Sequence, residues 1–105
     1  MEVFDTSIVE QIEMKMIRPS NFAVRDKFQE IHEMESLMSS IKEHGLLQPI
    51  LIRPKLGGFE IVAGHRRFQA CTSLRWRYMA CKIKEMSDKH CQQFSNYFLF
   101  GTSFL

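Results

Sequence analysis

The stretch from Phe59 to Ala70, FEIVAGHRRFQA, constrains the fold more than any other part of the chain. Its first half predicts a short strand, and its second half predicts a helix that begins just behind Gly64. The free N–H groups and the positive dipole end of a helix N-terminus attract anions. Arg66 and Arg67 stand where that dipole disfavours cations, and their guanidinium groups match phosphate oxygens. We therefore expect a phosphate site here, with a nucleotide as its ligand.

The charge distribution supports this expectation. Residues 1–52 hold five basic and nine acidic side chains, whereas residues 53–84 hold eight basic side chains and a single acid, Glu60. A basic block in the middle of the chain is typical of a surface that faces phosphates. The alternative is that alternating strand positions simply direct Lys and Arg to solvent.

Length and composition indicate one domain. The chain has 105 residues, no apolar run near the roughly 20 residues that a membrane span needs, and no secretory signal pattern at its N-terminus. We therefore expect a cytoplasmic protein without a membrane partner. Three cysteines without a CxxC pair predict neither a disulfide framework nor a zinc site, and we expect no metal ligands among them but small buried or free thiols.

Strand and helix patterns interleave along the chain. An amphipathic helix is predicted over 31–44, with Gly45 as the residue that ends it. A Ser87-Asp88 cap predicts a short helix through Phe94. The other expected elements are a half-buried strand over 8–17, a buried strand over 49–54, a turn over 55–58, a strand over 59–62, a helix over 66–74 and a strand over 78–83.

Two motifs in this order resemble the N-terminal domain of ParB-type partition proteins, of the ParB/sulfiredoxin-like superfamily. They are Gly45–Arg53, GLLQPILIR, and Gly64–Phe68, GHRRF, with the predicted hairpin between them. Arg25 stands where that family carries an arginine after its first strand. The resemblance covers about residues 8–86 and implies an α+β fold, a small mixed sheet with packed helices, over residues 1–86. Residues 87–105 would then form a short helix and an apolar tail.

The resemblance implies a nucleotide pocket between the two motifs. In nucleotide-binding members the second motif holds the phosphates of CTP with a magnesium ion. The residues carried over to this role are Gly64, His65, Arg66 and Arg67 for phosphate, Gly45 and Gln48 on the other side of the site, and Arg25 upstream. We expect Gly64 to let the ligand approach the backbone closely, so that Gly64→Val would abolish binding while the core survives.

The chain also departs from the family pattern. His65 stands where many ParB proteins have Glu, so CTP hydrolysis does not follow from the resemblance, and no catalytic residue is assigned. The acidic-asparagine helix of nucleotide-binding members is not recognisable over 88–94, and no helix-turn-helix pattern follows. We therefore expect contact with the DNA backbone to be non-specific and salt-sensitive, with partition proteins as further partners.

Enzymes on the same fold are the first alternative. Sulfiredoxins carry a catalytic cysteine where this chain has Gly64, and the nearest thiol, Cys71, lies two helical turns away, which disfavours that activity. Related serine kinases need acidic residues for proton transfer, and Glu60 is the only acid close by. Weak nucleotide hydrolysis is the enzymatic activity that the sequence leaves as an alternative. A nuclease would need a carboxylate cluster for metal ions, and the sequence offers none.

A shortened module with a vestigial pocket, acting through protein contact, is the other alternative. The apolar tail over 97–105 fits this, either as a homodimer interface or as a cover for its own domain. Arg75-Trp76-Arg77-Tyr78 has the basic-aromatic character of a nucleic-acid element. The more economical interpretation is that Trp76 covers the core at a helix-to-strand junction.

Overall fold

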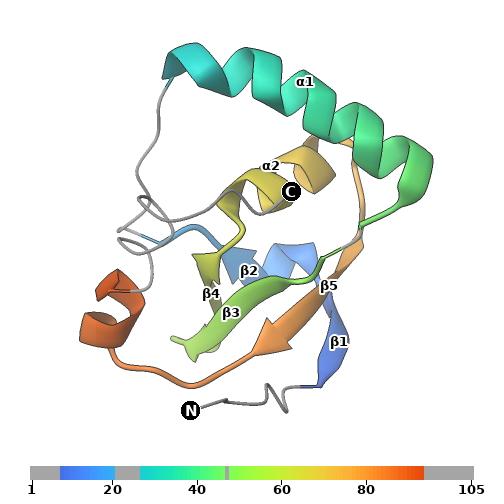
Figure 1. Ribbon diagram of the computed structural model, residues 1–105. Coiled ribbons are helices and arrows are strands. Elements are labelled where there is room, and N and C mark those ends of the chain that lie inside the picture. Colours follow the sequence, from blue (N-terminus) through green and yellow to red (C-terminus); the bar gives the residue numbers. More distant parts are fainter. Residues whose placement is uncertain (1–7, 21–26, 47, 94–105) are drawn as a thin grey trace, which may run out of the picture.

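The computed structural model describes residues 8–20, 27–46 and 48–93, with the backbone alone over 27–32 (Figure 1). Within these ranges one sheet is packed against two helices. The elements, in chain order, are β1 (Val9–Glu13), a 3-10 turn η1 (Met14–Met16), β2 (Ile17–Arg18), α1 (Lys27–His44), β3 (Ile50–Lys55), β4 (Gly58–Ala63), α2 (His65–Ser73) and β5 (Tyr78–Ile83).

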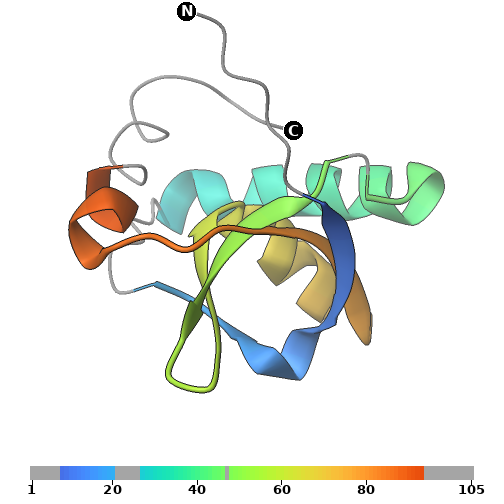
Figure 2. The same cartoon turned by 90° about the horizontal axis from the view of Figure 1, so that it is seen from below.

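The five strands form a mixed sheet in the order β1-β5-β3-β4-β2. The pairs β1–β5 and β3–β4 are antiparallel, whereas β3–β5 and β2–β4 are parallel. Helix α2 lies between α1 and the sheet (Figure 1), and the strands curl around α2 when the molecule is seen from below (Figure 2). This arrangement confirms the expected α+β fold, a small mixed sheet with packed helices.

The core lies between the sheet and the two helices. Its fully buried side chains include Ile50, Ile52, Ile61, Met79 and Cys71. The predicted apolar face of α1 packs against this cluster through Met34, Leu37, Met38 and Ile41. The helix begins at Lys27, four residues before the predicted start, and ends at His44 as predicted. Gly45 follows with φ 77° and donates its N–H to the Ile41 carbonyl at 2.8 Å.

The prediction of one strand over 8–17 is wrong, because η1 divides it. Strand β1 pairs with β5 at one edge of the sheet and β2 pairs with β4 at the other, so the chain has to cross between the edges. The corner is held by the Met14 N–H, which donates to the Arg77 carbonyl at 2.9 Å. Met14 is buried while Met16 is 40% exposed, so the alternating pattern that predicted the strand ends at the corner.

The later elements follow the sequence closely. The β3–β4 hairpin turns at Leu56 and Gly57, both with positive φ, as a two-residue hairpin loop requires. Residues 88–93 are helical, and the Ser87 hydroxyl oxygen accepts the His90 N–H at 3.2 Å, which confirms the predicted cap. Phe94 and the tail over 97–105 lie outside the described residues.

The three cysteines are buried and free, as the sequence predicted. Burial raises the pKa of Cys71 to about 11 and that of Cys81 to about 12. It also raises the pKa of Cys91, which packs in the segment after β5. All three thiols are therefore protonated packing groups at neutral pH.

Candidate functional site

The turn between β4 and α2 has the geometry of an anion site. Gly64 occupies the N-cap position of α2 with φ 104° and ψ 27°, and its carbonyl accepts the first helical hydrogen bond, from Phe68 N–H at 3.0 Å. The first turn of α2 contains no acidic residue and carries Arg66 and Arg67. The amides ahead of Phe68 have no partner within the helix, so they are available to a negatively charged group.

Glycine at position 64 is required by the protein's own packing. A β-carbon there would lie 2.5 Å from Ile50 Cγ2 and 2.9 Å from Ile50 Cβ, and φ is also positive. Ile50 is completely buried, so a larger residue at 64 would be forced into the core. The expectation that the core survives Gly64→Val is therefore wrong on this geometry.

Arg67 joins the two motifs that the sequence placed in one pocket. Its side chain is buried, and Nη1 donates to the Gln48 backbone carbonyl at 3.3 Å, to Gln48 Oε1 at 3.0 Å and to the Pro49 carbonyl at 3.4 Å. Burial lowers the pKa of Arg67, and in the described part of the chain no carboxylate pairs with it. A buried cation with only neutral acceptors favours an anion beside it.

Arg66 has a different environment. Its side chain is 45% exposed and pairs through Nη1 with a carboxylate oxygen of Glu33 on α1, itself 44% exposed. This ion pair links α2 to α1 beside the turn. A phosphate that binds Arg66 would have to replace the Glu33 carboxylate, which carries the same kind of oxygen ligand.

His65 holds the end of β2 against the start of α2. Its Nε2 accepts the backbone N–H of Ser20 at 3.2 Å, so the ring proton sits on Nδ1 in this arrangement. The structure therefore brings Gly64, His65, Arg66, Arg67 and Gln48 together. Gly45 precedes Gln48 by three residues and ends α1, while Arg25 lies outside the described residues.

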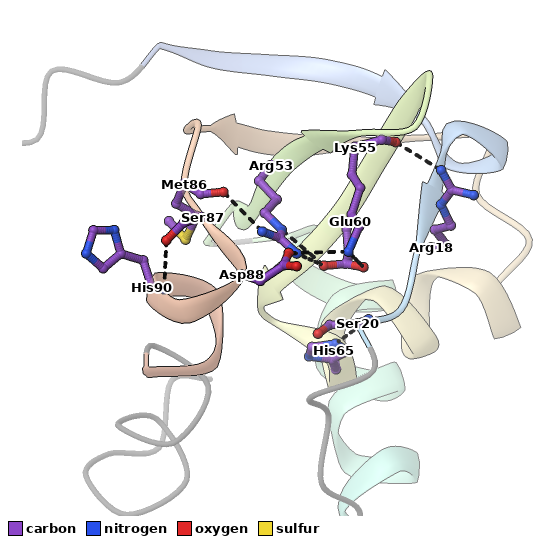
Figure 3. A network of polar contacts seen from close by, with 10 residues as sticks. All are labelled: Arg18, Ser20, Arg53, Lys55, Glu60, His65, Met86, Ser87, Asp88 and His90. Carbon is purple, nitrogen blue, oxygen red and sulfur yellow. Dashed lines mark hydrogen bonds and ion pairs between the residues drawn. The ribbon is translucent and has the colours of Figure 1, made fainter.

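A polar network that was not predicted from the sequence lies beside this site (Figure 3). Arg53 is buried and donates from Nε at 3.0 Å and Nη2 at 2.6 Å to Glu60 Oε1, and from Nη2 to Asp88 Oδ1 at 2.6 Å. Lys55 adds ion pairs to Glu60 at 3.6 Å and Asp88 at 3.4 Å. Arg53 and Glu60 are direct partners across the hairpin, and their opposite charges at facing positions were the available signal.

This network changes two earlier expectations. Part of the basic block between 53 and 84 is neutralised internally, because Arg53 and Lys55 serve Glu60 and Asp88 rather than a phosphate surface. Glu60 is itself buried in an ion pair, so it is poorly placed as the base that a kinase reaction would need. The hydrogen bonds from Arg53 and Lys55 lower the pKa of Asp88.

Two further features define what the described residues can do. Trp76 is partly buried against the core, which confirms its structural interpretation. Among residues 8–20, 27–46 and 48–93, no three His, Cys, Asp or Glu side chains are grouped to hold a metal ion. None of the helices in these ranges is long and apolar enough to cross a membrane.

The chain folds into a small α+β domain in which helix α2 begins directly behind a glycine turn and carries two arginines in its first turn. Residues 2–96 match the ParB N-terminal domain, and the chain belongs to this family. It is 40% identical over 88 residues to a nucleoid occlusion protein of Halalkalibacterium halodurans, covering 84% of this chain and 31% of the relative. The chain thus spans about a third of that relative's length.

Solved structures agree with this assignment. The C-terminally truncated chromosome-partitioning protein ParB of Caulobacter crescentus, complexed with CTP-gamma-S, superposes with a TM-score of 0.79 at 26% identity, over 92% of this chain and 55% of that one. The same protein complexed to the centromeric parS site gives a TM-score of 0.68 at 25% identity, over 82% and 44%. Sulfiredoxin of Arabidopsis thaliana shares the fold, with a TM-score of 0.65 at 21% identity over 83% and 96%.

Proposed function

We propose that this domain binds CTP, with magnesium, at the turn between β4 and α2, and that the bound nucleotide serves a role in DNA partition or nucleoid occlusion. The observation that carries the proposal is Arg67, a buried guanidinium that has only neutral acceptors in the described part of the chain. It lies at the N-terminus of a nine-residue helix whose first turn contains no acid. Phosphate beside it would offset the cost of burying this charge. The C. crescentus ParB of similar fold has been solved with CTP-gamma-S.

Each residue of the turn has a distinct part in this proposal. Backbone N–H groups behind Gly64 donate to phosphate oxygens. Arg67 places its buried charge beside the phosphates, while its Nη1 keeps Gln48 on the opposite side of the site. Arg66 leaves Glu33 and turns to the phosphates. Magnesium would be held mainly by the phosphates and by the waters that this ion usually keeps in nucleotide sites.

The test is a calorimetric titration of the whole chain with CTP-gamma-S, ATP and ADP, each with and without magnesium. Arg66→Ala should weaken CTP-gamma-S binding about ten- to a hundredfold, since a hydrogen bond to a charged group contributes about 1.5–3 kcal/mol. Arg77→Ala removes another exposed arginine, which lies between α2 and β5, and should leave the affinity unchanged.

Glu33→Gln should change the affinity for CTP-gamma-S in the opposite direction to Arg66→Ala. Because Glu33 competes with phosphate for Arg66, its neutralisation should tighten binding. The gain should not exceed about fivefold, since a half-exposed ion pair contributes about 0–1 kcal/mol. The proposal fails if the folded wild-type domain binds none of the nucleotides, or if Arg66→Ala and Arg77→Ala bind alike.

A further inference from the structure

The end of α2 opposite the nucleotide turn carries an arginine in an unfavourable backbone conformation. Arg75 has φ 62°, its N–H donates to the Thr72 carbonyl at 3.0 Å, and the Trp76 N–H donates to the Cys71 carbonyl at 3.0 Å. These two bonds form a Schellman motif, in which the left-handed position strongly favours glycine. Arginine here reduces stability relative to glycine, and a residue held in such a conformation directs attention to function.

The side chains around this corner point to an anionic partner. Arg75 and Arg77 are exposed, and in the described part of the chain neither forms an ion pair. The Arg77 guanidinium lies over the Tyr78 ring, 5.9 Å from its centroid, and that ring is 45% exposed. Trp76 between them packs against the core, so the two arginines flank an anchored residue. The negative end of the α2 dipole favours a cation at position 75, but its effect does not extend to a second cation at Arg77, which lies beyond the last helical turn.

The neighbouring turn adds to the same corner. The Met14 N–H in η1 donates to the Arg77 carbonyl, so the exposed Lys15 directly follows a residue that is bonded to Arg77. The acid that strand register brings here is Glu13, opposite Tyr78, and its carboxylate is already 3.4 Å from Lys15 Nζ. The corner therefore keeps an excess of positive charge after its internal ion pair is counted.

We propose that Arg75, Arg77, Tyr78 and Lys15 form a second anion-binding surface, which contacts the sugar–phosphate backbone of duplex DNA. Two residues of chain separate the arginine α-carbons by at most about 7 Å, a spacing suited to successive phosphates along one strand. A guanidinium stacked on an aromatic ring keeps its N–H edge free to donate to phosphate. This surface is distinct from the nucleotide turn, because the nine residues of α2 place it about 13 Å away.

Fluorescence anisotropy of the full chain with a duplex of arbitrary sequence, titrated at several salt concentrations, tests the proposal. For each phosphate contact removed, the log–log salt slope should become less steep by about 0.9. Arg75→Gly and Arg77→Ala should each remove one contact, and the double variant two. Lys84→Ala, an exposed basic residue at the end of β5, is the matched control and should change the slope less than either.

Two further measurements distinguish loss of DNA contact from misfolding and from an effect on the nucleotide site. Arg75→Gly should raise the thermal midpoint while it weakens DNA binding, so its loss of affinity cannot come from unfolding. The double variant should keep its affinity for CTP-gamma-S, which separates this proposal from the nucleotide proposal. An unchanged salt slope in the double variant overturns the assignment. If poly-glutamate binds the wild type and not the double variant while duplex DNA binds neither, the surface serves an acidic protein instead.

Discussion

Substituting alanine for Gly64 should destabilise the domain far more than a change of one methyl group suggests. Two effects act together at this position. The backbone has φ 104°, which an L-residue adopts at a cost of about 1–2 kcal/mol. The new β-carbon would also lie 2.5 Å from Ile50 Cγ2, and overpacking of a core costs about 1–3 kcal/mol.

The sum is a loss of about 2–5 kcal/mol in the free energy of unfolding. A domain of this size is stabilised by only about 5–15 kcal/mol in total, so Gly64→Ala removes a large share of it. The measurement is urea denaturation followed by far-ultraviolet circular dichroism, with the slope m compared between variants to confirm two-state unfolding.

Gly45→Ala is the matched control, because Gly45 has a similar positive φ of 77° but, apart from its chain neighbours, no atom of the described residues lies within 4 Å of its β-carbon position. It should lose only the conformational part, about 1–2 kcal/mol. The excess loss in Gly64→Ala measures the collision with Ile50. Combining Gly64→Ala with Ile50→Ala removes Cγ2 and should give a favourable coupling energy of about 0.5–3 kcal/mol. Equal losses in the two glycine variants, or strict additivity in the double variant, would refute the steric argument.

Three other results are expected. Arg53→Met should cost about 3–5 kcal/mol at pH 7, because it leaves the Glu60 carboxylate buried without its partner, and adding Glu60→Gln should restore part of the loss in urea denaturation. The folded state lowers the pKa of Asp88, so the stabilising contribution of this carboxylate is complete above about pH 4 and is lost as pH falls through the lowered pKa. Asp88→Asn should therefore make the free energy of unfolding depend less on pH below about pH 4, and should leave its pH dependence near pH 7 unchanged. A thiol reagent at pH 8 should label none of the three cysteines in the native domain and all three in denaturant, because they are buried and burial raises the pKa of Cys71 to about 11; rapid native labelling would contradict the described packing.

Much of the fold follows from short-range patterns. The strand at 78–83, the hairpin around Gly57, the helix behind Gly64 and the end of α1 at Gly45 lie where the sequence predicts them. Each depends on residues a few positions apart, such as a glycine that takes positive φ or an apolar period that suits one kind of element. The family resemblance implied that the two motifs lie close together, and the described contacts between Arg67 and Gln48 agree with it.

What the sequence could not decide is which partner each side chain meets. The alternating pattern over 8–17 gave no sign that the chain crosses from one edge of the sheet to the other, since that depends on the strand order. Three arginines of the basic block have different partners. Arg53 is buried in an ion pair with Glu60, Arg66 pairs with Glu33 of α1, and Arg67 donates hydrogen bonds to the segment before β3. Only the long-range packing of the sheet and helices separates these roles, because the energy of a charge is set by its burial and its neighbours in space.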